Sequence, residues 1–185
     1  TKYSDKILKK KIDINKSDKQ YNISPLMISV AKHMEKEFDK LINDKRINIY
    51  NTDKYGNTIL HYVIVDGHYD FLIKILEIFE NFNFQCLEGK TPFHLLIERN
   101  DLFHKLYQNN NKLFNKIVDK TNFNLMNKDG ETVGFNLLKN GLNDISLEII
   151  KKKKINPLIS NLEGNDIVDI VKNDQVFLKV FIDKY

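Results

Sequence analysis

Apolar residues along this 185-residue chain follow a short pattern that recurs about every 33 residues. Each occurrence starts at a turn and continues into apolar positions three or four residues apart, the spacing of one helix face. The third residues of five such segments fall at 24, 58, 91, 132 and 166, in steps of 34, 33, 41 and 34. A near-constant period of this size is typical of a repeat protein.

The five segments begin at residues 22, 56, 89, 130 and 164 and read NISPL, GNTIL, GKTPF, GETVG and GNDIV. Their first residue is glycine or asparagine, which most easily adopt the positive φ of a tight turn. Their third residue is Ser, Thr or Asp, whose side-chain oxygen can cap a helix. Pro25 and Pro92 follow at the first helical position, where no N–H hydrogen bond is lost. The sequence therefore predicts a turn and a helix start in each repeat.

A second apolar stretch follows in each repeat and predicts a second helix, for example at residues 71–79, 145–150 and 176–181. Short alternating apolar and polar pieces come between repeats and predict brief extended segments at residues 47–49, 82–84, 123–125 and 155–157. The 41-residue step exceeds the period of 33 by eight residues (41 − 33). We expect this insertion to lengthen the loop or the second helix around residues 107–111.

This unit resembles the ankyrin repeat, and the closest matches to it are DKYGNTILH and GKTPFHL. In that family a Thr-Pro-Leu-His tetrapeptide opens the inner helix, and its Thr and His brace neighbouring loops through hydrogen bonds. The resemblance therefore implies structural roles for Thr58 and His61 and for Thr91 and His94. Other repeats depart from the pattern.

The resemblance implies an all-α repeat fold, an ankyrin-like solenoid of helix-turn-helix units with short β-hairpin-like turns, forming one domain. Met27 and Asn136 stand near the histidine position, and Gly134 replaces a buried leucine. We expect a segment of a longer array whose last repeat is cut short. The assigned parts are the end of a preceding partial repeat (1–20), repeat 1 (21–52), repeat 2 (53–85), repeat 3 with the insertion (86–126), repeat 4 (127–157) and repeat 5 (158–185).

The net charge of +4 comes from one end of the chain. Residues 1–20 hold seven Lys and three Asp (7 − 3 = +4), whereas the remainder holds 22 basic and 22 acidic residues. A nucleic-acid binder normally carries a broad basic face, so this balance disfavours a nucleic-acid ligand. The lysine runs at 9–11 and 151–154 occupy the same repeat position, the last turn of a second helix, where cations complement the negative helix end. Docking of phosphate groups on these runs is the alternative.

The composition also indicates the cellular compartment of the protein. The single cysteine, Cys86, excludes an internal disulfide and favours a reducing environment. No apolar run reaches the roughly 18 residues of a membrane span. We expect an intracellular protein, cytoplasmic or nuclear. The abundance of Asn, Ile and Lys indicates an AT-rich genome, such as that of a large DNA virus, a protist or a yeast.

Motifs for catalysis and cofactor binding are weak. The segment GKT at residues 89–91 matches the end of a phosphate-binding loop, but Phe84 stands where that motif needs a glycine. Ser24 has a capping role and no paired base at a diagnostic spacing. None of the five histidines forms a His-Glu-x-x-His pair, and Cys86 has no cysteine neighbour. We therefore expect no enzyme activity, no metal, no cofactor and no small-molecule substrate.

What remains is a surface. Members of the ankyrin family usually bind another protein on a concave face of turn tips and inner-helix residues. Carried over by position, the candidate protein-binding residues are Lys54, Tyr55, Asn57, Val65, Asp66, Leu87, Glu88, Lys90, Glu98, Arg99, Lys128 and Asp129. Further positions of the same kind are Glu131, Lys139, Asn140, Leu162, Glu163 and Asn165.

Tyr55 and Leu87 are the most informative candidates, because an exposed apolar tip residue has no packing role and tyrosine is enriched in interface hot spots. The alternative is that either side chain packs against a neighbouring repeat. The expected function is an adaptor or scaffold that binds a protein partner of unknown identity. The alternative function is a regulatory or substrate-recognition segment of a larger enzyme whose catalytic domain lies outside this chain.

Overall fold

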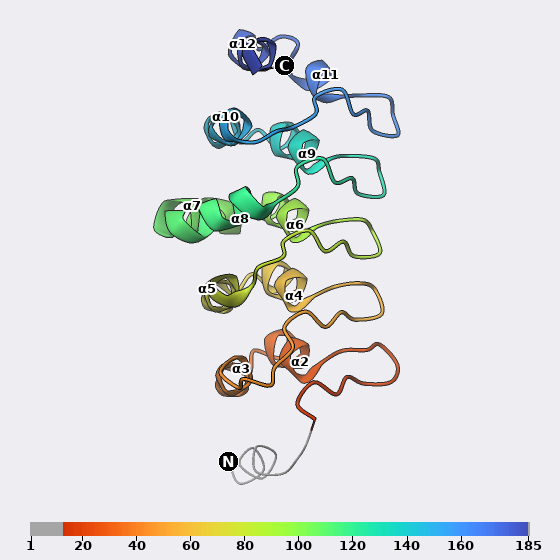
Figure 1. Ribbon diagram of the computed structural model, residues 1–185, viewed down its shortest axis with the longest axis vertical. Helices are drawn as coiled ribbons and strands as arrows, with labels where there is room; N and C mark the ends of the chain where they lie inside the picture. The colour runs from red at the N-terminus through yellow and green to blue at the C-terminus, as the bar shows by residue number, and fades with distance from the viewer. Residues whose placement is uncertain (1–12, 185) are drawn as a thin grey trace. The chain divides into compact units, whose positions relative to one another are not determined.

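The computed structural model describes residues 13–184, so the lysine run at 9–11 and most of the preceding partial repeat lie outside the described residues. The chain forms two compact units, one ending at Phe79 and the other beginning at Glu80 (Figure 1). The described residues are helical and contain no strand beyond an isolated antiparallel bridge between Met126 and Thr132. The expected all-α repeat fold is therefore confirmed.

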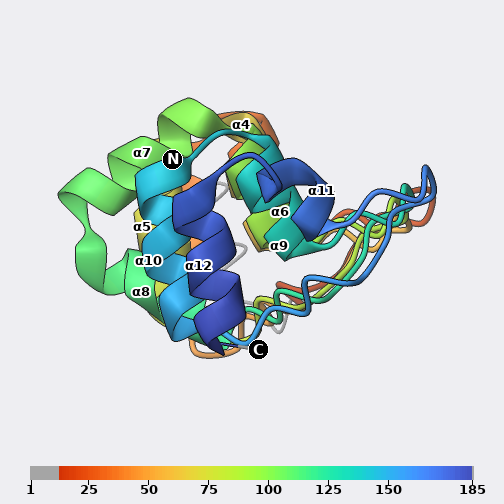
Figure 2. The same cartoon turned by 90° about the horizontal axis from the view of Figure 1, so that it is seen from above.

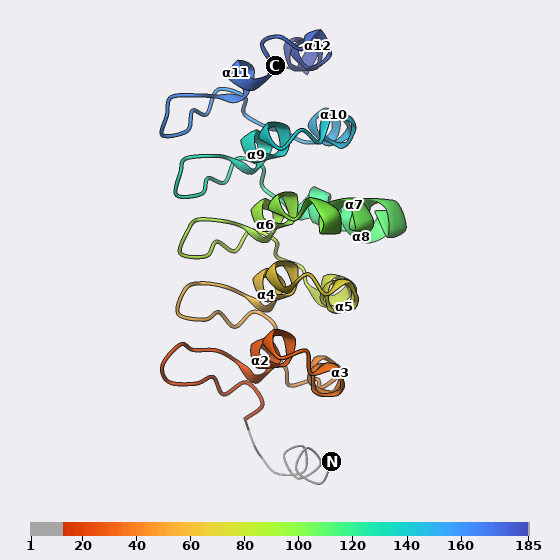
Figure 3. The same cartoon turned by 180° about the vertical axis from the view of Figure 1, so that it is seen from behind.

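Unit 1 contains two helix pairs, with a turn before each pair. Its helices are α2 (Pro25–Ala31), α3 (Glu35–Ile42), α4 (Ile59–Asp66) and α5 (Tyr69–Ile78). The inner helix α2 packs against α3 and α4, and α4 packs against α5. The turns project from the side of α2 and α4, away from α3 and α5 (Figure 3). The rings of Phe38 and Phe71 stack 4.2 Å apart in the buried core between the outer helices.

Unit 2 repeats this arrangement three times. Its helices are α6 (Pro92–Glu98), α7 (Asn100–Asn109), α8 (Asn111–Lys120), α9 (Val133–Lys139), α10 (Asn143–Lys152), α11 (Ile167–Val171) and α12 (Gln175–Lys184). The inner helices α6, α9 and α11 contact one another in that order, and α10 contacts α12. Seen from above, the turns of unit 2 project from the side of these inner helices, away from α10 and α12 (Figure 2).

The predicted helix starts and turns are confirmed. The N-cap residues of the five inner helices are Ser24, Thr58, Thr91, Thr132 and Asp166. The turn residues with positive φ are Asn22, Gly56, Gly89, Gly130 and Gly164. Both expected prolines lie in the first turn of their helices. The observed helices fall inside the assigned repeats, whose boundaries stay a prediction.

The outer helices largely follow the predicted apolar pattern. Residues Phe71, Leu72, Ile75 and Leu76 of α5 are buried. In α12 the prediction that Val176 is a core residue is wrong, because this side chain is 59% exposed. The side chains that α12 does bury are Phe177 and Phe181, four residues apart, so its apolar face begins one residue later than expected.

The insertion in repeat 3 forms an additional helix instead of a longer loop or a single longer helix. Helix α7 ends at Asn109, and Asn110 leaves the helical conformation with φ −145° and ψ 66°. The Asn110 side chain then caps α8 by accepting a hydrogen bond of 3.2 Å from the backbone N–H of Leu113. The rings of Phe103 and Phe114 lie 5.3 Å apart in an edge-to-face arrangement that packs α8 against α7.

The expected extended returns do not form strands among the described residues, because asparagine side chains supply much of their pairing. In unit 1 the backbone N–H of Asn48 donates to the side-chain oxygen of Asn15 over 2.7 Å. In unit 2 the backbone N–H of Asn156 donates to the side-chain oxygen of Asn124 over 2.8 Å. The asparagine content, interpreted above as genome composition, therefore also has a structural role.

Candidate protein-interaction surface

Within each unit the turns and inner helices form one continuous surface, which we call the turn face. It consists of the turns with α2 and α4 in unit 1, and of the turns with α6, α9 and α11 in unit 2. All twelve candidate residues in the predicted set lie on turns or at the ends of inner helices, and all are exposed or partly exposed. Unit 1 contributes Lys54, Tyr55, Asn57, Val65 and Asp66, and unit 2 contributes the others.

The turns are built around a side chain that the sequence analysis missed. In repeat 2, Asp53 Oδ1 accepts hydrogen bonds of 2.8 Å from the backbone N–H groups of Tyr55 and Asn57. Asn127 and Asn161 accept equivalent pairs of bonds in repeats 4 and 5. The signal was present in the sequence, since each of these residues stands three positions before the turn glycine. Cys86 occupies that position in repeat 3.

Backbone hydrogen bonds join successive turn tips inside each unit. In unit 1 the N–H of Lys54 donates to the carbonyl oxygen of Tyr21 over 2.8 Å. In unit 2 the N–H of Lys128 donates to the carbonyl oxygen of Glu88 over 2.7 Å. Gly89 permits this close approach, because a Cβ atom there would lie 2.9 Å from the backbone Cα of Asn127. The tips are consequently fixed relative to one another within a unit.

An aromatic cluster covers the tips of unit 1. The Lys54 ammonium lies 3.7 Å from the centroid of the Tyr21 ring and 5.0 Å from that of Tyr55, a cation–π arrangement. Tyr55 is nevertheless 43% exposed. Beneath it, the Tyr62 hydroxyl donates to Asp53 Oδ2 over 3.1 Å. Burial and the nearby Asp53 carboxylate raise the pKa of Tyr62 above its usual range, so this hydroxyl keeps its proton.

The charged residues of the turn face in unit 2 are paired with one another. The shortest nitrogen–oxygen distances are 2.9 Å for Lys90–Glu98, 3.0 Å for Lys128–Glu88 and 2.6 Å for Lys139–Glu131. The hydrogen bond from Lys128 lowers the pKa of Glu88. The tips of unit 2 also carry exposed apolar side chains, since Leu87 is 76% and Leu162 is 80% exposed.

The Thr and His pairs have the bracing role that the resemblance implied. The N–H groups of Thr58 and Thr91 donate to Nδ1 of His61 and His94, each over 3.1 Å. His94 also reaches the next turn, with its Nε2 3.3 Å from the carbonyl oxygen of Glu131. Burial lowers the pKa of His94 to about 4, which keeps the ring neutral at physiological pH.

In repeat 4, Asn136 stands next to the histidine position, one residue after it. The third helical position, which His61 and His94 fill elsewhere, is taken by Phe135 and not by Asn136, because the N-cap is Thr132. Asn136 instead donates from its side-chain nitrogen to Glu131 Oε2 over 3.2 Å. In repeat 1, Met27 fills the histidine position as a buried apolar side chain.

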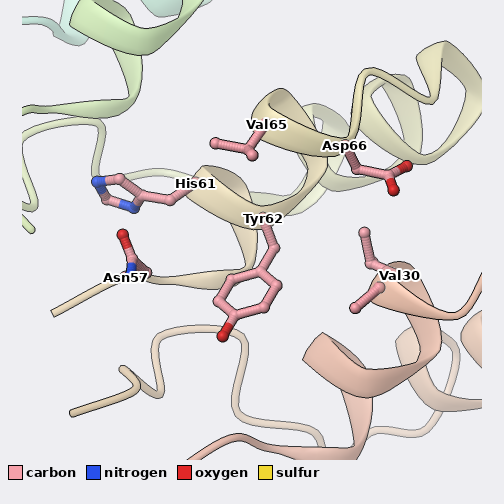
Figure 4. Close-up of a pocket in the computed structure, with 7 residues that line it drawn as sticks. Val30, Asn57, His61, Tyr62, Val65 and Asp66 are labelled. Atoms are coloured by element: carbon pink, nitrogen blue, oxygen red, sulfur yellow. The ribbon is translucent and has the colours of Figure 1, made fainter. Parts of the chain in front are cut away.

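A pocket of about 370 Å³ opens on the turn face of unit 1 (Figure 4). Three candidate residues line it, Asn57, Val65 and Asp66. The remaining walls come from Val30, Ala31, His61 and Tyr62. The Asp66 side chain is only 13% exposed, and its Oδ1 lies 3.5 Å from Nε2 of His33. Among residues 13–184 no hydrogen-bond donor reaches its Oδ2.

Lysines of the run at 151–154 make contacts near the C-terminal ends of helices. Lys152 pairs with Glu148 over 2.6 Å within α10. Lys153 Nζ donates to the carbonyl oxygen of Asp119 over 2.7 Å, in the last turn of α8. These contacts fit the predicted interaction of the run with negative helix ends.

In the part of the chain from residue 13 to residue 184, no three His, Cys, Asp or Glu side chains are grouped so that they could bind a metal ion. No helix formed by these residues has the length and apolar character required to cross a membrane.

Comparison with known proteins finds a distant relative. No protein-family model matches the chain. An ankyrin repeat protein of Acanthamoeba polyphaga mimivirus is 22% identical over 202 aligned residues, which cover 94% of this chain and 25% of the viral protein. The chain therefore spans about a quarter of the length of this relative.

Two crystal structures share the fold. An ankyrin repeat domain from Acinetobacter baumannii aligns with a TM-score of 0.69 and 16% identity, covering 97% of this chain and 88% of the other. A second ankyrin repeat protein aligns with a TM-score of 0.66 and 15% identity, covering 100% of this chain and 91% of the other. Together with the turn and helix geometry, these similarities show that the chain has the ankyrin repeat fold.

Proposed function

We propose that this chain is a non-catalytic adaptor or scaffold module that binds a protein partner on its turn face. Protein binding is the usual role of ankyrin repeat proteins, which are typically not enzymes. The observation that carries the proposal is the exposure of apolar side chains on this face, where Tyr55, Val65 and Leu87 are 43%, 62% and 76% exposed. Apolar groups kept in water at a rigid surface gain free energy when a partner covers them.

The rigidity of the turns supports the same function. In repeats 2, 4 and 5 the side-chain oxygens of Asp53, Asn127 and Asn161 accept hydrogen bonds from the turn backbone. Backbone hydrogen bonds also join successive tips inside each unit. A surface fixed in this way loses little conformational entropy on binding, so more of the contact energy becomes affinity. The paired charges around Lys90 and Glu88 would select partners of complementary pattern.

The alternative is a regulatory or substrate-recognition segment of a larger enzyme. The viral relative is about four times longer than the matched segment, which leaves room in that protein for other domains. Nothing in residues 13–184 favours this alternative over a scaffold, and the binding face would be the same in both cases.

The proposal is tested by affinity purification with three forms of the chain. These are the wild type, the double variant Tyr55→Ala/Leu87→Ala, and the control Ile78→Ala/Ile182→Ala, which removes exposed apolar groups from the outer helices α5 and α12. Proteins recovered by the wild type are purified and their affinities measured. We expect the control to keep the partner and the turn-face variant to lose it. Retention of every partner by the turn-face variant would contradict the proposal.

A further inference from the structure

The pocket of unit 1 has the shape and charge to receive one basic side chain. We propose that it binds an arginine side chain of the protein partner, with the guanidinium held by Asp66. This inference rests on the proposed function, because it names the chemistry that the turn face recognises at one point. Three features carry it: the walls of the pocket, the state of the Asp66 carboxylate and the contrast with neighbouring acids.

The walls fit the methylene chain of an arginine. Val30 and Ala31 of α2 and Val65 of α4 present aliphatic groups to the pocket, and Tyr62 adds an aromatic ring (Figure 4). The volume of about 370 Å³ exceeds what one side chain needs. Long basic side chains commonly lay their methylene groups along apolar surface while the charged head binds elsewhere.

One oxygen of the carboxylate at the end of the pocket has no hydrogen-bond donor among residues 13–184. The figure shows the Asp66 carboxylate beside Val30, at the edge of the pocket (Figure 4). Within the described part of the chain its Oδ2 accepts no hydrogen bond, and its Oδ1 is 3.5 Å from His33, whose own side chain is 63% exposed. A buried carboxylate oxygen without a donor raises the free energy of the folded protein. A guanidinium supplies several donors in a planar fork that matches a carboxylate.

Several other acids of the chain already have close cations. Glu98 and Glu131 of unit 2 lie within 3 Å of lysine ammonium groups, at 2.9 and 2.6 Å. Asp39 of unit 1 pairs with Lys74 over 2.6 Å. Asp66 has the longer contact of 3.5 Å with His33, and no lysine or arginine among residues 13–184 forms an ion pair with it. An incoming cation therefore competes with none of these lysines or arginines.

Arginine is favoured over lysine by the acceptors around the pocket. Asn57 also lines the pocket, and its side-chain nitrogen donates to Asp53 Oδ2 over 3.0 Å, so its amide oxygen is the group that can accept a further hydrogen bond. The five N–H donors of a guanidinium can satisfy two separated acceptors, whereas a lysine ammonium acts as a compact point charge.

The test titrates the 15N-labelled chain with three short peptides, acetyl-Gly-X-Gly-amide, in which X is arginine, citrulline or glutamate. Citrulline has nearly the shape of arginine without its charge. We expect the arginine peptide to shift the backbone resonances of Val30, Val65 and Asp66 with weak affinity, and the citrulline peptide to bind about tenfold more weakly, because charge-assisted hydrogen bonds are the stronger ones. The substitution Asp66→Asn should weaken arginine binding by about the same factor, whereas Asp39→Asn should leave it unchanged.

Equal binding of the citrulline peptide would overturn the proposal, as would shifts confined to residues away from the pocket, or none. Circular dichroism of Asp66→Asn verifies that the variant is folded. The two proposals fail separately: a purified partner that binds Asp66→Asn as tightly as the wild type, yet is lost from Tyr55→Ala/Leu87→Ala, would refute the arginine pocket and support the turn face.

Discussion

The imidazole of His94 links two repeats of unit 2, with its Nε2 atom 3.3 Å from the backbone carbonyl oxygen of Glu131. Its Nδ1 faces the other way and accepts from the N–H of Thr91 over 3.1 Å. The Nδ1 atom must therefore be unprotonated, and Nε2 must carry the hydrogen that it donates to Glu131. A single neutral ring thus holds the start of α6 against the following turn.

This arrangement makes stability depend on pH. Burial lowers the pKa of His94 from 6.5 to about 4, so the unfolded chain binds the proton more readily between these values. The free energy of unfolding should be constant above pH 6.5 with respect to this group and fall as the pH decreases through that window, by roughly 2–3 kcal/mol at pH 4.5. Urea denaturation at pH 7 and pH 4.5 measures the fall, which should be smaller in His94→Gln. An equal fall in the variant would show that His94 is not responsible.

Cys86 is expected to weaken the turn of repeat 3. Asn127 and Asn161 accept two backbone N–H bonds from the same turn position, and a thiol is a weaker acceptor. The substitution Cys86→Asn should therefore raise the free energy of unfolding by about 1 kcal/mol. The reverse change, Asn127→Cys, should lower it by a similar amount. Thermal unfolding followed by circular dichroism checks both, and a destabilised Cys86→Asn would contradict the equivalence of these positions.

In unit 2 the side chain of Ile155 occupies the space next to Gly134 that a larger residue at position 134 would need. A Cβ atom at Gly134 would lie 2.6 Å from Cγ2 of Ile155, which is fully buried. The clash should cost about 1–3 kcal/mol, more than the roughly 1 kcal/mol that alanine gains over glycine in a helix. Gly134→Ala should thus destabilise the wild type but stabilise the Ile155→Ala background. A double-mutant cycle in urea measures the coupling, and the same sign in both backgrounds would refute it.

The asparagine hydrogen bonds between the extended segments of successive repeats should contribute measurably to the free energy of unfolding. Asn124 accepts the backbone N–H of Asn156 over 2.8 Å. Removing the acceptor in Asn124→Ala should lower the free energy of unfolding by about 1 kcal/mol. The control Asn115→Ala, on the exposed surface of α8, removes only a local side-chain contact and should change stability little. If both variants unfold at the same denaturant concentration, the asparagine contacts are not stabilising.

The repeat period, the caps and the positive-φ turns were predictable because they depend on residues adjacent in sequence. Ser24 and Thr58 cap helices that begin at the next residue, and Gly56 completes a four-residue turn. The third helix of repeat 3 was not predicted, because its start depends on Asn110 leaving the helix within a polar run that is equally compatible with a loop.

Features that depend on contacts between residues distant in sequence could not be predicted from the sequence. The absence of a leucine at position 134 was evident, but its replacement by the side chain of Ile155 requires the segment that follows α10 to fold back onto α9. The pocket at Asp66 likewise joins α2 to α4, and only its individual residues were candidates beforehand. The role of the turn aspartate and asparagines could have been found by aligning the repeats on their glycines.

The most direct test of the central claim is hydrogen–deuterium exchange of the chain alone and bound to a purified partner. If the turn face is the binding surface, slower exchange on binding should be confined to the turns and inner helices, including residues 53–57 and 86–90. The outer helices α3, α5, α7, α8, α10 and α12 should exchange at unchanged rates. Protection found on the outer helices, with the turns unaffected, would contradict the account.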